Sequence, residues 1–283
     1  MRVEQLGEGT PEIAVVGSIH GDEPCGARAV ERLLAASPDL DRPVKFVVAN
    51  ERALAENARY VDEDLNRAFP GDPDADTHEG RLAHKLTQEL RDCTIFSMHS
   101  TQSYATPFAL VDELDPLAAS VVPYLTVEAL IETVNFSEGR LLESQDVIEV
   151  ECGLQGSERA AENAYDLTRQ FLGAVGAIEP PRAPHEDVSV FRMDRMLPKP
   201  PATEYETFAT NFERVAEGET YARADDELFV ADRPFYPILL SPYGYETEFG
   251  YTGDLVGRLD EQAIPGPSAS TRSRPRRPRF PVP

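Results

Sequence analysis

The fold of this chain is decided by the stretch Ile13-Ala14-Val15-Val16-Gly17-Ser18-Ile19-His20-Gly21-Asp22-Glu23-Pro24-Cys25-Gly26. Its first four residues are apolar and predict a buried strand, and the segment after it carries Val30, Leu33 and Leu34 at helical spacing. The stretch therefore predicts a strand, a loop and a helix. His20 and Glu23 lie three residues apart in the loop, and its glycines permit the bend that two zinc ligands would need. Alone, such a pair is more often part of an ordinary polar loop.

The same alternation of strand and helix continues along the chain. Apolar, β-branched runs predict strands at 44–50, 93–98 and about 147–151, and amphipathic segments predict helices after Asp76 and after Ser157. Asp76 and Glu79 have the spacing of a capping box at the first of these helices. The alternation predicts an α/β fold, in which a mostly parallel sheet has helices on both faces.

Three polar residues stand where predicted strands give way to loops: His20, His99 and Glu151. In an open α/β sheet the carboxyl ends of the strands line the crevice that binds ligands, so these side chains are expected to converge. Two histidines and one carboxylate form the donor set of a catalytic zinc ion. With Glu23 as the ligand carboxylate, Glu151 would be free to act as a base.

The loop at 59–71 has two interpretations. It contains Arg59-Tyr60 and, further on, Asp64-Leu65-Asn66-Arg67 before a Pro-Gly turn. A solvated acidic loop is common in a chain of this composition. A guanidinium next to an amide is, however, suited to binding a carboxylate. The residue types alone leave both interpretations open.

Taken together, these motifs resemble the succinylglutamate desuccinylase/aspartoacylase family, relatives of the zinc carboxypeptidases. The resemblance covers roughly residues 13–156, with a plausible β-rich part after them. It rests on four motifs in the family order: His-Gly-Asp-Glu-Pro-Cys-Gly at 20–26, Arg59-Tyr60 with Asp64-Leu65-Asn66-Arg67, His99-Ser100, and Glu151-Cys152-Gly153-Leu154-Gln155. It implies a zinc-dependent hydrolase that cleaves the amide bond of a small N-acyl amino acid.

The resemblance also implies a role for each motif residue. One Zn²⁺ per chain would be held by His20, Glu23 and His99. Glu151 would be the general base toward an activated water, and Arg59 would polarise the scissile carbonyl. The implied substrate-binding residues are Asn66, Arg67, Arg140 and Tyr245. Arg140 lies near the place of an arginine that family members often carry about ten residues before the catalytic glutamate, and Tyr243 and Tyr251 are alternatives to Tyr245.

The charge of the chain indicates which binding partners are disfavoured and what kind of organism the protein comes from. With 50 acidic and 27 basic residues the formal net charge is -23, and only three of the basic residues are lysine. Repulsion of this size is screened only at high salt, so the composition predicts a protein from a halophile. It disfavours nucleic acid as a partner of the body of the chain, and a small-molecule substrate is expected.

Domain boundaries and location are predicted from the same composition. The Pro-rich stretch at 179–184 separates a catalytic domain at 1–180 from a small β-rich domain at 185–260, and a Pro/Arg-rich tail at 261–283 is expected to be disordered. No apolar run approaches the ~20 residues of a membrane span, and the polar N-terminus shows no signal peptide. We therefore expect a cytoplasmic protein without a membrane partner, and leave homo-oligomerisation open.

Three alternatives remain at this point. The first is a zinc carboxypeptidase that acts on peptides and shares the metal and the base. The second is a non-catalytic, zinc-containing ligand-binding module, against which the presence of Glu151 and Arg59 argues. The third is a hydrolase with Cys152 as nucleophile, although its neighbour Glu151 explains the motif better.

Overall fold

A computed structural model of the chain describes residues 1–144, 146–185 and 187–259. Its strands are β1 (Arg2–Leu6), β2 (Ile13–Gly17), β3 (Val44–Val48), β4 (Thr94–Thr101), β5 (Phe108–Val111), β6 (Ala129–Glu132), β7 (Val147–Leu154), β8 (Val188–Pro198), β9 (Tyr205–Thr207), β10 (Thr220–Ala224), β11 (Glu227–Val230), β12 (Tyr236–Ile238) and β13 (Glu248–Leu259). Its α-helices are α1 (Cys25–Ala36), α2 (Glu51–Glu56), α3 (His78–Glu89), α4 (Pro116–Val121) and α5 (Glu158–Ala174). In these described parts no helix has the length and apolar character that crossing a membrane requires.

Ten of the strands form one large sheet in the order β1-β3-β2-β4-β7-β5-β6-β8-β13-β12. The central strands β3, β2, β4 and β7 run parallel, and β5, β6 and β8 form a second parallel group that joins β7 through an antiparallel pair. The outer pairs β1–β3, β8–β13 and β12–β13 are antiparallel. The predicted α/β class with a mostly parallel sheet is confirmed.

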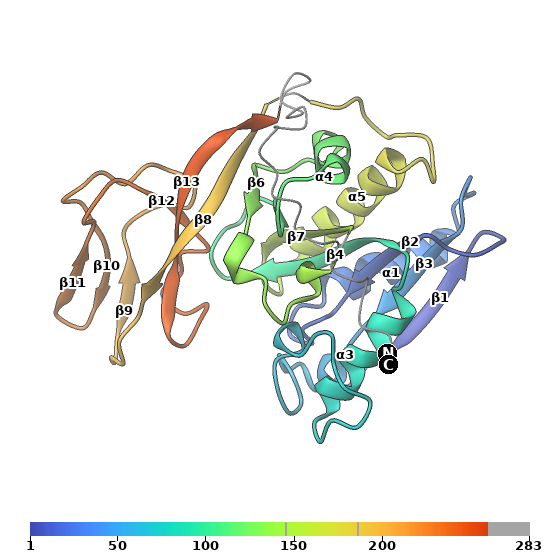
Figure 1. Ribbon diagram of the computed structural model, residues 1–283, viewed down its shortest axis with the longest axis horizontal. Coiled ribbons are helices and arrows are strands. Elements are labelled where there is room, and N and C mark those ends of the chain that lie inside the picture. Colours follow the sequence, from blue (N-terminus) through green and yellow to red (C-terminus); the bar gives the residue numbers. More distant parts are fainter. Residues whose placement is uncertain (145, 186, 260–283) are drawn as a thin grey trace, which may run out of the picture.

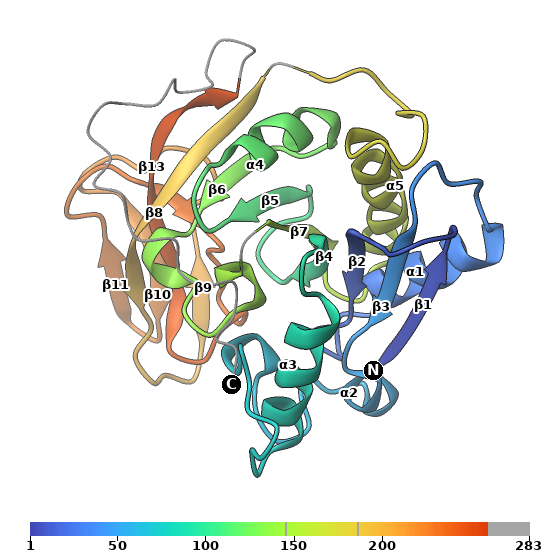
Figure 2. The same ribbon diagram turned by 45° about the vertical axis from the view of Figure 1, so that its right-hand side comes forward.

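Helices cover both faces of this sheet (Figures 1 and 2). One face packs α1, α4 and α5 against alternate residues of the central strands, and Phe96 of β4 stacks on Phe171 of α5 with ring centroids 4.7 Å apart. The other face packs α3, whose Leu82 and Leu86 lie in the same cluster as Ile95 of β4. Strands buried on both faces read as continuous apolar runs, which is why their positions could be predicted from the sequence.

A small antiparallel sheet, β11-β10-β9, is formed by the chain between β8 and β12 of the large sheet, and it matches the expected β-rich C-terminal part. It has a core of its own, which includes Tyr221, Phe235 and Phe249. The large sheet nevertheless continues past residue 180, because β8 pairs in parallel with β6. The division at 1–180 and 185–260 therefore stays a prediction, and the tail at 261–283 lies outside the described residues.

The caps of two helices can be compared with their predictions. Ser157 caps α5 as expected, and its hydroxyl accepts the N–H of Ala160 at 3.1 Å. At α3 the predicted capping box is wrong, because the N-cap is Thr77, whose hydroxyl accepts the N–H of Gly80. Glu79 does not reach back to a capping residue. It turns toward the loop that precedes the helix.

Candidate metal centre and substrate pocket

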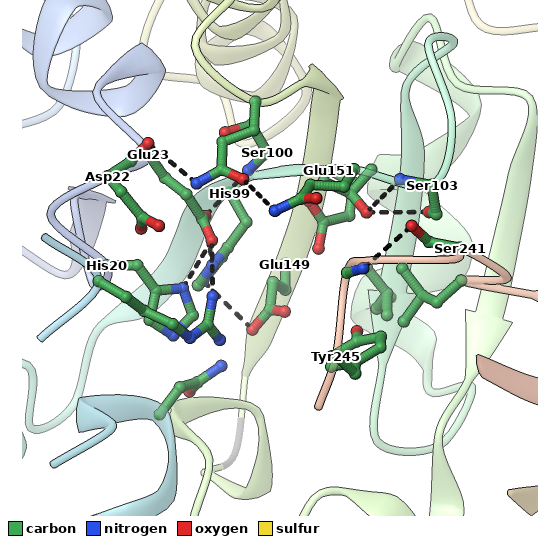
Figure 3. Close-up of a pocket in the computed structure, with 18 of the residues that line it drawn as sticks. His20, Asp22, Glu23, His99, Ser100, Ser103, Glu149, Glu151, Ser241 and Tyr245 are labelled. Atoms are coloured by element: carbon green, nitrogen blue, oxygen red, sulfur yellow. Dashed lines mark hydrogen bonds and ion pairs between the residues drawn. The ribbon is translucent and has the colours of Figure 1, made fainter. Parts of the chain in front are cut away.

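The candidate site lies at the carboxyl ends of the central parallel strands (Figure 3). His20 and Glu23 come from the loop between β2 and α1, and His99 comes from β4. Glu151 lies on the neighbouring strand β7, directly opposite His99 in the register of the pair. Short apolar strands thus deliver polar side chains at one edge of the sheet, as the sequence predicts.

A compact group of His20, Glu23 and His99 could hold a metal ion. All three are buried, and their potential ligand atoms lie within 4.8 Å of one another. Nδ1 of His20 is 2.8 Å from Oε1 of Glu23, and Nδ1 of His99 is 3.2 Å from Oε2 of the same carboxylate. The carboxylate also accepts the backbone N–H of Ser100 at 3.0 Å.

The outer ring nitrogen of each histidine faces away from Glu23. Nε2 of His20 lies 3.0 Å from Oδ1 of Asp64. Nε2 of His99 lies 3.3 Å from the hydroxyl of Ser97 and 3.6 Å from Oε2 of Glu149. Partners on Nε2 fix the tautomer and the ring orientation, so both Nδ1 atoms are directed to one point. This donor set of two imidazoles and one carboxylate fits zinc with a position left open.

Strong electrostatic coupling follows from packing these groups together. Burial alone would raise the pKa of Glu23, but His20 and His99 outweigh it and hold that pKa far below its usual range. Burial would lower the pKa of His99, yet the carboxylates of Glu149, Glu23 and Glu151 raise it to about 10. The excess negative charge around the two imidazoles is what a divalent cation would neutralise.

Arg59 and Asp64 extend this group on the side of the loop after β3. Nε and Nη2 of Arg59 donate to Oδ2 of Asp64 at 3.2 and 3.0 Å, and Nη1 donates to Oε1 of Glu23 at 3.3 Å. Burial favours the neutral carboxyl of Asp64, but hydrogen bonding to His20 and the charge of Arg59 hold its pKa well below the usual range. Arg59 thus stands beside the metal group with its guanidinium fixed at both ends.

Glu151 is a carboxylate without a fixed partner. It is buried, and its Oε2 has no hydrogen-bond partner within the described parts of the chain. Burial and the neighbouring charge of Glu23 raise its pKa well above the ordinary value for glutamate. A carboxylate in such surroundings can accept a proton and hold it, which is the property that a general base requires.

The remaining predicted residues lie together on another wall of the pocket: Asn66, Arg67, Arg140 and Tyr245. Arg140 is buried, and its Nε has no partner in the described residues. Desolvation and the nearby charge of Arg140 lower the pKa of Arg67, whose side chain reaches the surface. Two guanidiniums side by side form a site for an anion. The amide oxygen of Asn66 is already used, because it accepts the N–H of Leu141 at 3.1 Å.

A known protein family matches more than half of this chain. Residues 9–174 match the sequence model of the succinylglutamate desuccinylase/aspartoacylase catalytic domain. The chain belongs to this family. The membership confirms the resemblance drawn from the four motifs. It does not by itself assign a role to any of the residues above.

Curated relatives match over shorter stretches. Over 88 residues the chain is 38% identical to the N-acyl-aromatic-L-amino acid amidohydrolase (carboxylate-forming) of Rattus norvegicus. This match covers 28% of this chain and 27% of the rat protein. Over 127 residues it is 28% identical to a probable aspartoacylase of Acaryochloris marina, which covers 41% of this chain and 43% of that protein. The matches therefore span less than half the length of these relatives.

Solved structures share the fold over most of the chain. The product-bound ectoine utilization protein EutE from Ruegeria pomeroyi superposes with a TM-score of 0.73 at 20% identity, over 89% of this chain and 87% of that one. Murine aminoacylase 3 gives a TM-score of 0.67 at 20% identity, over 89% and 99%. At such identities the likeness shows the shared fold alone.

Several residues at this site of the desuccinylase/aspartoacylase fold were not predicted. Asp64 and Glu149 each stand two residues before a predicted site residue, and alternation along β7 places Glu149 on the same face as Glu151. The pocket is also lined by polar residues to which the motifs assigned no role: Asp22, Gln102, Ser103 and Ser241. Of the candidate tyrosines, Tyr245 lines the pocket, whereas Tyr243 is largely exposed.

The thiol of Cys152 does not fit the nucleophile of a cysteine hydrolase. It is fully buried, and burial together with the neighbouring Cys25 raises its pKa well above the ordinary value. A nucleophilic cysteine needs a depressed pKa and access to the substrate. The structure therefore argues against this alternative.

Proposed function

We propose that this protein is a zinc-dependent deacylase that hydrolyses the amide bond of a small N-acyl amino acid. One observation supports this most: the group His20-Glu23-His99, the unpaired carboxylate of Glu151 and the arginine pair Arg67-Arg140 line a single pocket. The family membership and the similarity to N-acyl amino acid amidohydrolases support the same reaction.

Zinc is the metal that the donor set favours, and His20, Glu23 and His99 would hold one ion per chain. Bound there, zinc would supply Lewis acidity, which polarises a carbonyl and makes water acidic enough to react near neutral pH. Asp64 would hold the ring of His20 in the tautomer that presents Nδ1, and Ser97 with Glu149 would do the same for His99.

The protons of the reaction would be handled by Glu151. Hydrolysis of an amide requires a base that removes a proton from water and an acid that returns it to the leaving amine. A raised pKa lets one carboxyl group do both in turn. The fixed guanidinium of Arg59 would stabilise the negative charge that develops on the carbonyl oxygen.

The carboxylate of the amino acid would bind between Arg67 and Arg140. Two neighbouring guanidiniums repel one another until an anion lies between them, and bidentate hydrogen bonds then fix its orientation. Asn66 would support this wall through its bond to Leu141, and Tyr245 would close it from the C-terminal part of the chain. Such contacts would supply orientation of the substrate more than chemistry.

The test combines metal analysis with a substrate panel. Purified protein should contain one zinc ion per chain, and His20→Ala should lose it; undiminished zinc in the variant would remove His20 from the ligand set. The holoenzyme should hydrolyse N-acyl amino acids in preference to peptides with a free C-terminus. A preference for peptides would indicate a carboxypeptidase, and zinc binding without turnover of either class would indicate a ligand-binding module.

A further inference from the structure

Glu79 is a fully buried carboxylate that lies outside the pocket. It belongs to the first turn of α3 and is 0% exposed. A buried charge is costly unless it is paired or hydrogen-bonded, so its retention needs a physical explanation. The explanation lies in the loop that precedes α3.

Four amide groups donate hydrogen bonds to this carboxylate. Oε1 accepts the backbone N–H of Val61 at 2.7 Å and the side-chain amide of Asn50 at 2.9 Å. Oε2 accepts the backbone N–H of Asp62 at 3.0 Å and that of Glu63 at 3.3 Å. Three consecutive backbone N–H groups converge on one carboxylate and thereby fix the backbone of this segment. Both oxygens of the carboxylate act as acceptors, which requires the ionised form.

The segment fixed in this way joins two residues of the candidate site. Arg59 precedes it and donates to Glu23, while Asp64 follows it and contacts Nε2 of His20. The carbonyl of Arg59 also accepts the N–H of Gly21, which lies between His20 and Glu23 in the chain. A shift of the segment would therefore move both Arg59 and Asp64 relative to the metal group.

Contacts at the start of α3 support the same arrangement. The N–H of His78 donates to Oδ2 of Asp62 at 2.7 Å, and the hydroxyl of Thr77 contacts the carboxylate of Glu63. These two contacts, one exposed and one partly buried, join the loop to the start of the helix. Glu79 is the buried centre of this junction.

We propose that Glu79 is a positioning residue: it holds the segment 61–63 so that Arg59 and Asp64 are placed against the metal group. This inference rests on the proposed function, on its zinc site for the affinity readout and on its reaction for the kinetic readout. The hydrogen bonds of Glu79 and the affinity for zinc can be measured whether or not N-acyl amino acids are substrates.

The decisive variant is Glu79→Gln, with Glu89→Gln as its matched control. Glutamine has the same shape, but its NH₂ group would face N–H donors and lose two of the four hydrogen bonds. Glu89 lies at the other end of α3 and pairs with Lys45, so the control makes the same charge change on the same helix, away from the loop. Zinc affinity is measured by competition with a chelator, and kcat and KM on an N-acyl amino acid, both at a temperature where each variant is folded.

We expect Glu79→Gln to weaken zinc binding about 10-fold and to lower kcat about 10-fold or more. It would displace Asp64, the outer partner of His20, and loss of such a partner has an effect of this size. Glu89→Gln should leave both unchanged. A Glu79→Gln protein that melts at a lower temperature but binds zinc and turns over like the wild type would overturn the proposal. If wild type shows no turnover, the proposed function fails, and the zinc arm still decides the role of Glu79.

Two further measurements cover a Glu79→Gln protein that does not fold. Glu79→Asp keeps the charge but shortens the reach by one methylene, and should give a partial loss of zinc affinity. In the wild type, hydrogen exchange should be slow at the amides of Val61, Asp62 and Glu63, although the loop reaches the surface. Exchange there as fast as in an unstructured segment would contradict the proposal without any variant.

Discussion

The two halves of the site are built differently. The strand half consists of His99, Glu149 and Glu151 on β4 and β7, where sheet hydrogen bonds fix each residue opposite its neighbour. The loop half consists of Arg59, Asp64, Asn66 and Arg67, which follow β3; all of them except the buried Asn66 are partly open to solvent. Strand residues are placed by the register of the sheet, whereas loop residues depend on individual hydrogen bonds. Substitutions in the two halves should therefore have different consequences.

The largest effect is expected in the strand half, on Glu151. Glu151→Gln keeps the shape of the side chain but cannot accept a proton, so kcat should fall at least ~100-fold with little change in zinc content. Steady-state kinetics on N-acyl amino acids measures this, after metal analysis of the variant. Glu158→Gln, an exposed acid at the start of α5, is the control for the loss of one charge. Near-normal kcat in zinc-loaded Glu151→Gln would rule out Glu151 as the base.

The loop half should fail in another way when Arg67 is removed. Arg67→Ala leaves the metal group and Glu151 in place but removes a charged partner of the substrate carboxylate. A charge-assisted hydrogen bond contributes about 1.5–3 kcal/mol, so KM should rise roughly 10- to 100-fold while kcat changes little. A loss confined to kcat would instead place Arg67 in the chemical step.

The same division explains how much could be predicted from the sequence. Buried strands are visible as apolar runs, and their carboxyl ends indicated His20, His99 and Glu151 before any relative was considered. The residue types of the loop residues Arg59 and Arg67 do not decide their roles, which are implied only by the family resemblance. The contacts of Asp64, Glu149 and Glu79 are not predictable in this way, although Asp64 lies in a family motif and the sequence assigns Glu79 to a capping box. The partner of a single acid in a chain with 50 of them is unknown until its neighbours in space are known.

The two candidate zinc-binding histidines allow a direct comparison of the halves. Asp64 lies within hydrogen-bond distance of Nε2 of His20. Glu149 is 3.6 Å from Nε2 of His99, and the hydrogen-bond partner of that nitrogen is Ser97. Asp64→Asn should therefore weaken zinc binding about 10-fold, and Glu149→Gln by less. Chelator competition on both variants gives the two dissociation constants. A greater loss in Glu149→Gln would mean that the strand half controls the metal.

Acid should weaken the loop half through Glu79. Burial alone would raise the pKa of Glu79, but hydrogen bonds from Val61, Asn50, Asp62 and Glu63 lower it below the ordinary value of 4.5. A depressed folded-state pKa stabilises the protein above pH 4.5, and this contribution is lost as the pH falls through the folded-state pKa. The difference in melting temperature between wild type and Glu79→Gln should therefore shrink as the pH is lowered from 7 toward 3. A difference that stays constant would contradict this linkage.

Salt should produce the smallest effect per charge. It should act on the exposed loop half more than on the buried strand half. The net charge of -23 makes repulsion between exposed carboxylates a general cost, and the loop half is followed by exposed acids at Asp72, Asp74 and Asp76. The Debye length, beyond which exposed charges are screened from one another, falls from about 10 Å at 0.1 M salt to about 3 Å at 1 M. Buried groups such as Glu149 are screened much less. Potassium chloride should therefore raise the melting temperature by several degrees between dilute and molar solutions.

Hydrogen exchange gives the local readout of the same experiment. Protection of the loop amides at 61–63 should increase with salt, whereas amides of β4 and β7 should change only with global stability, because sheet bonds between buried strands do not depend on screening of the surface. Sodium chloride at equal ionic strength is the control for a specific effect of potassium. A melting temperature that is flat or falls with salt would contradict the prediction of a halophilic protein. Equal gains in the loop and in the strands would show that surface repulsion acts on the whole fold and does not distinguish the two halves.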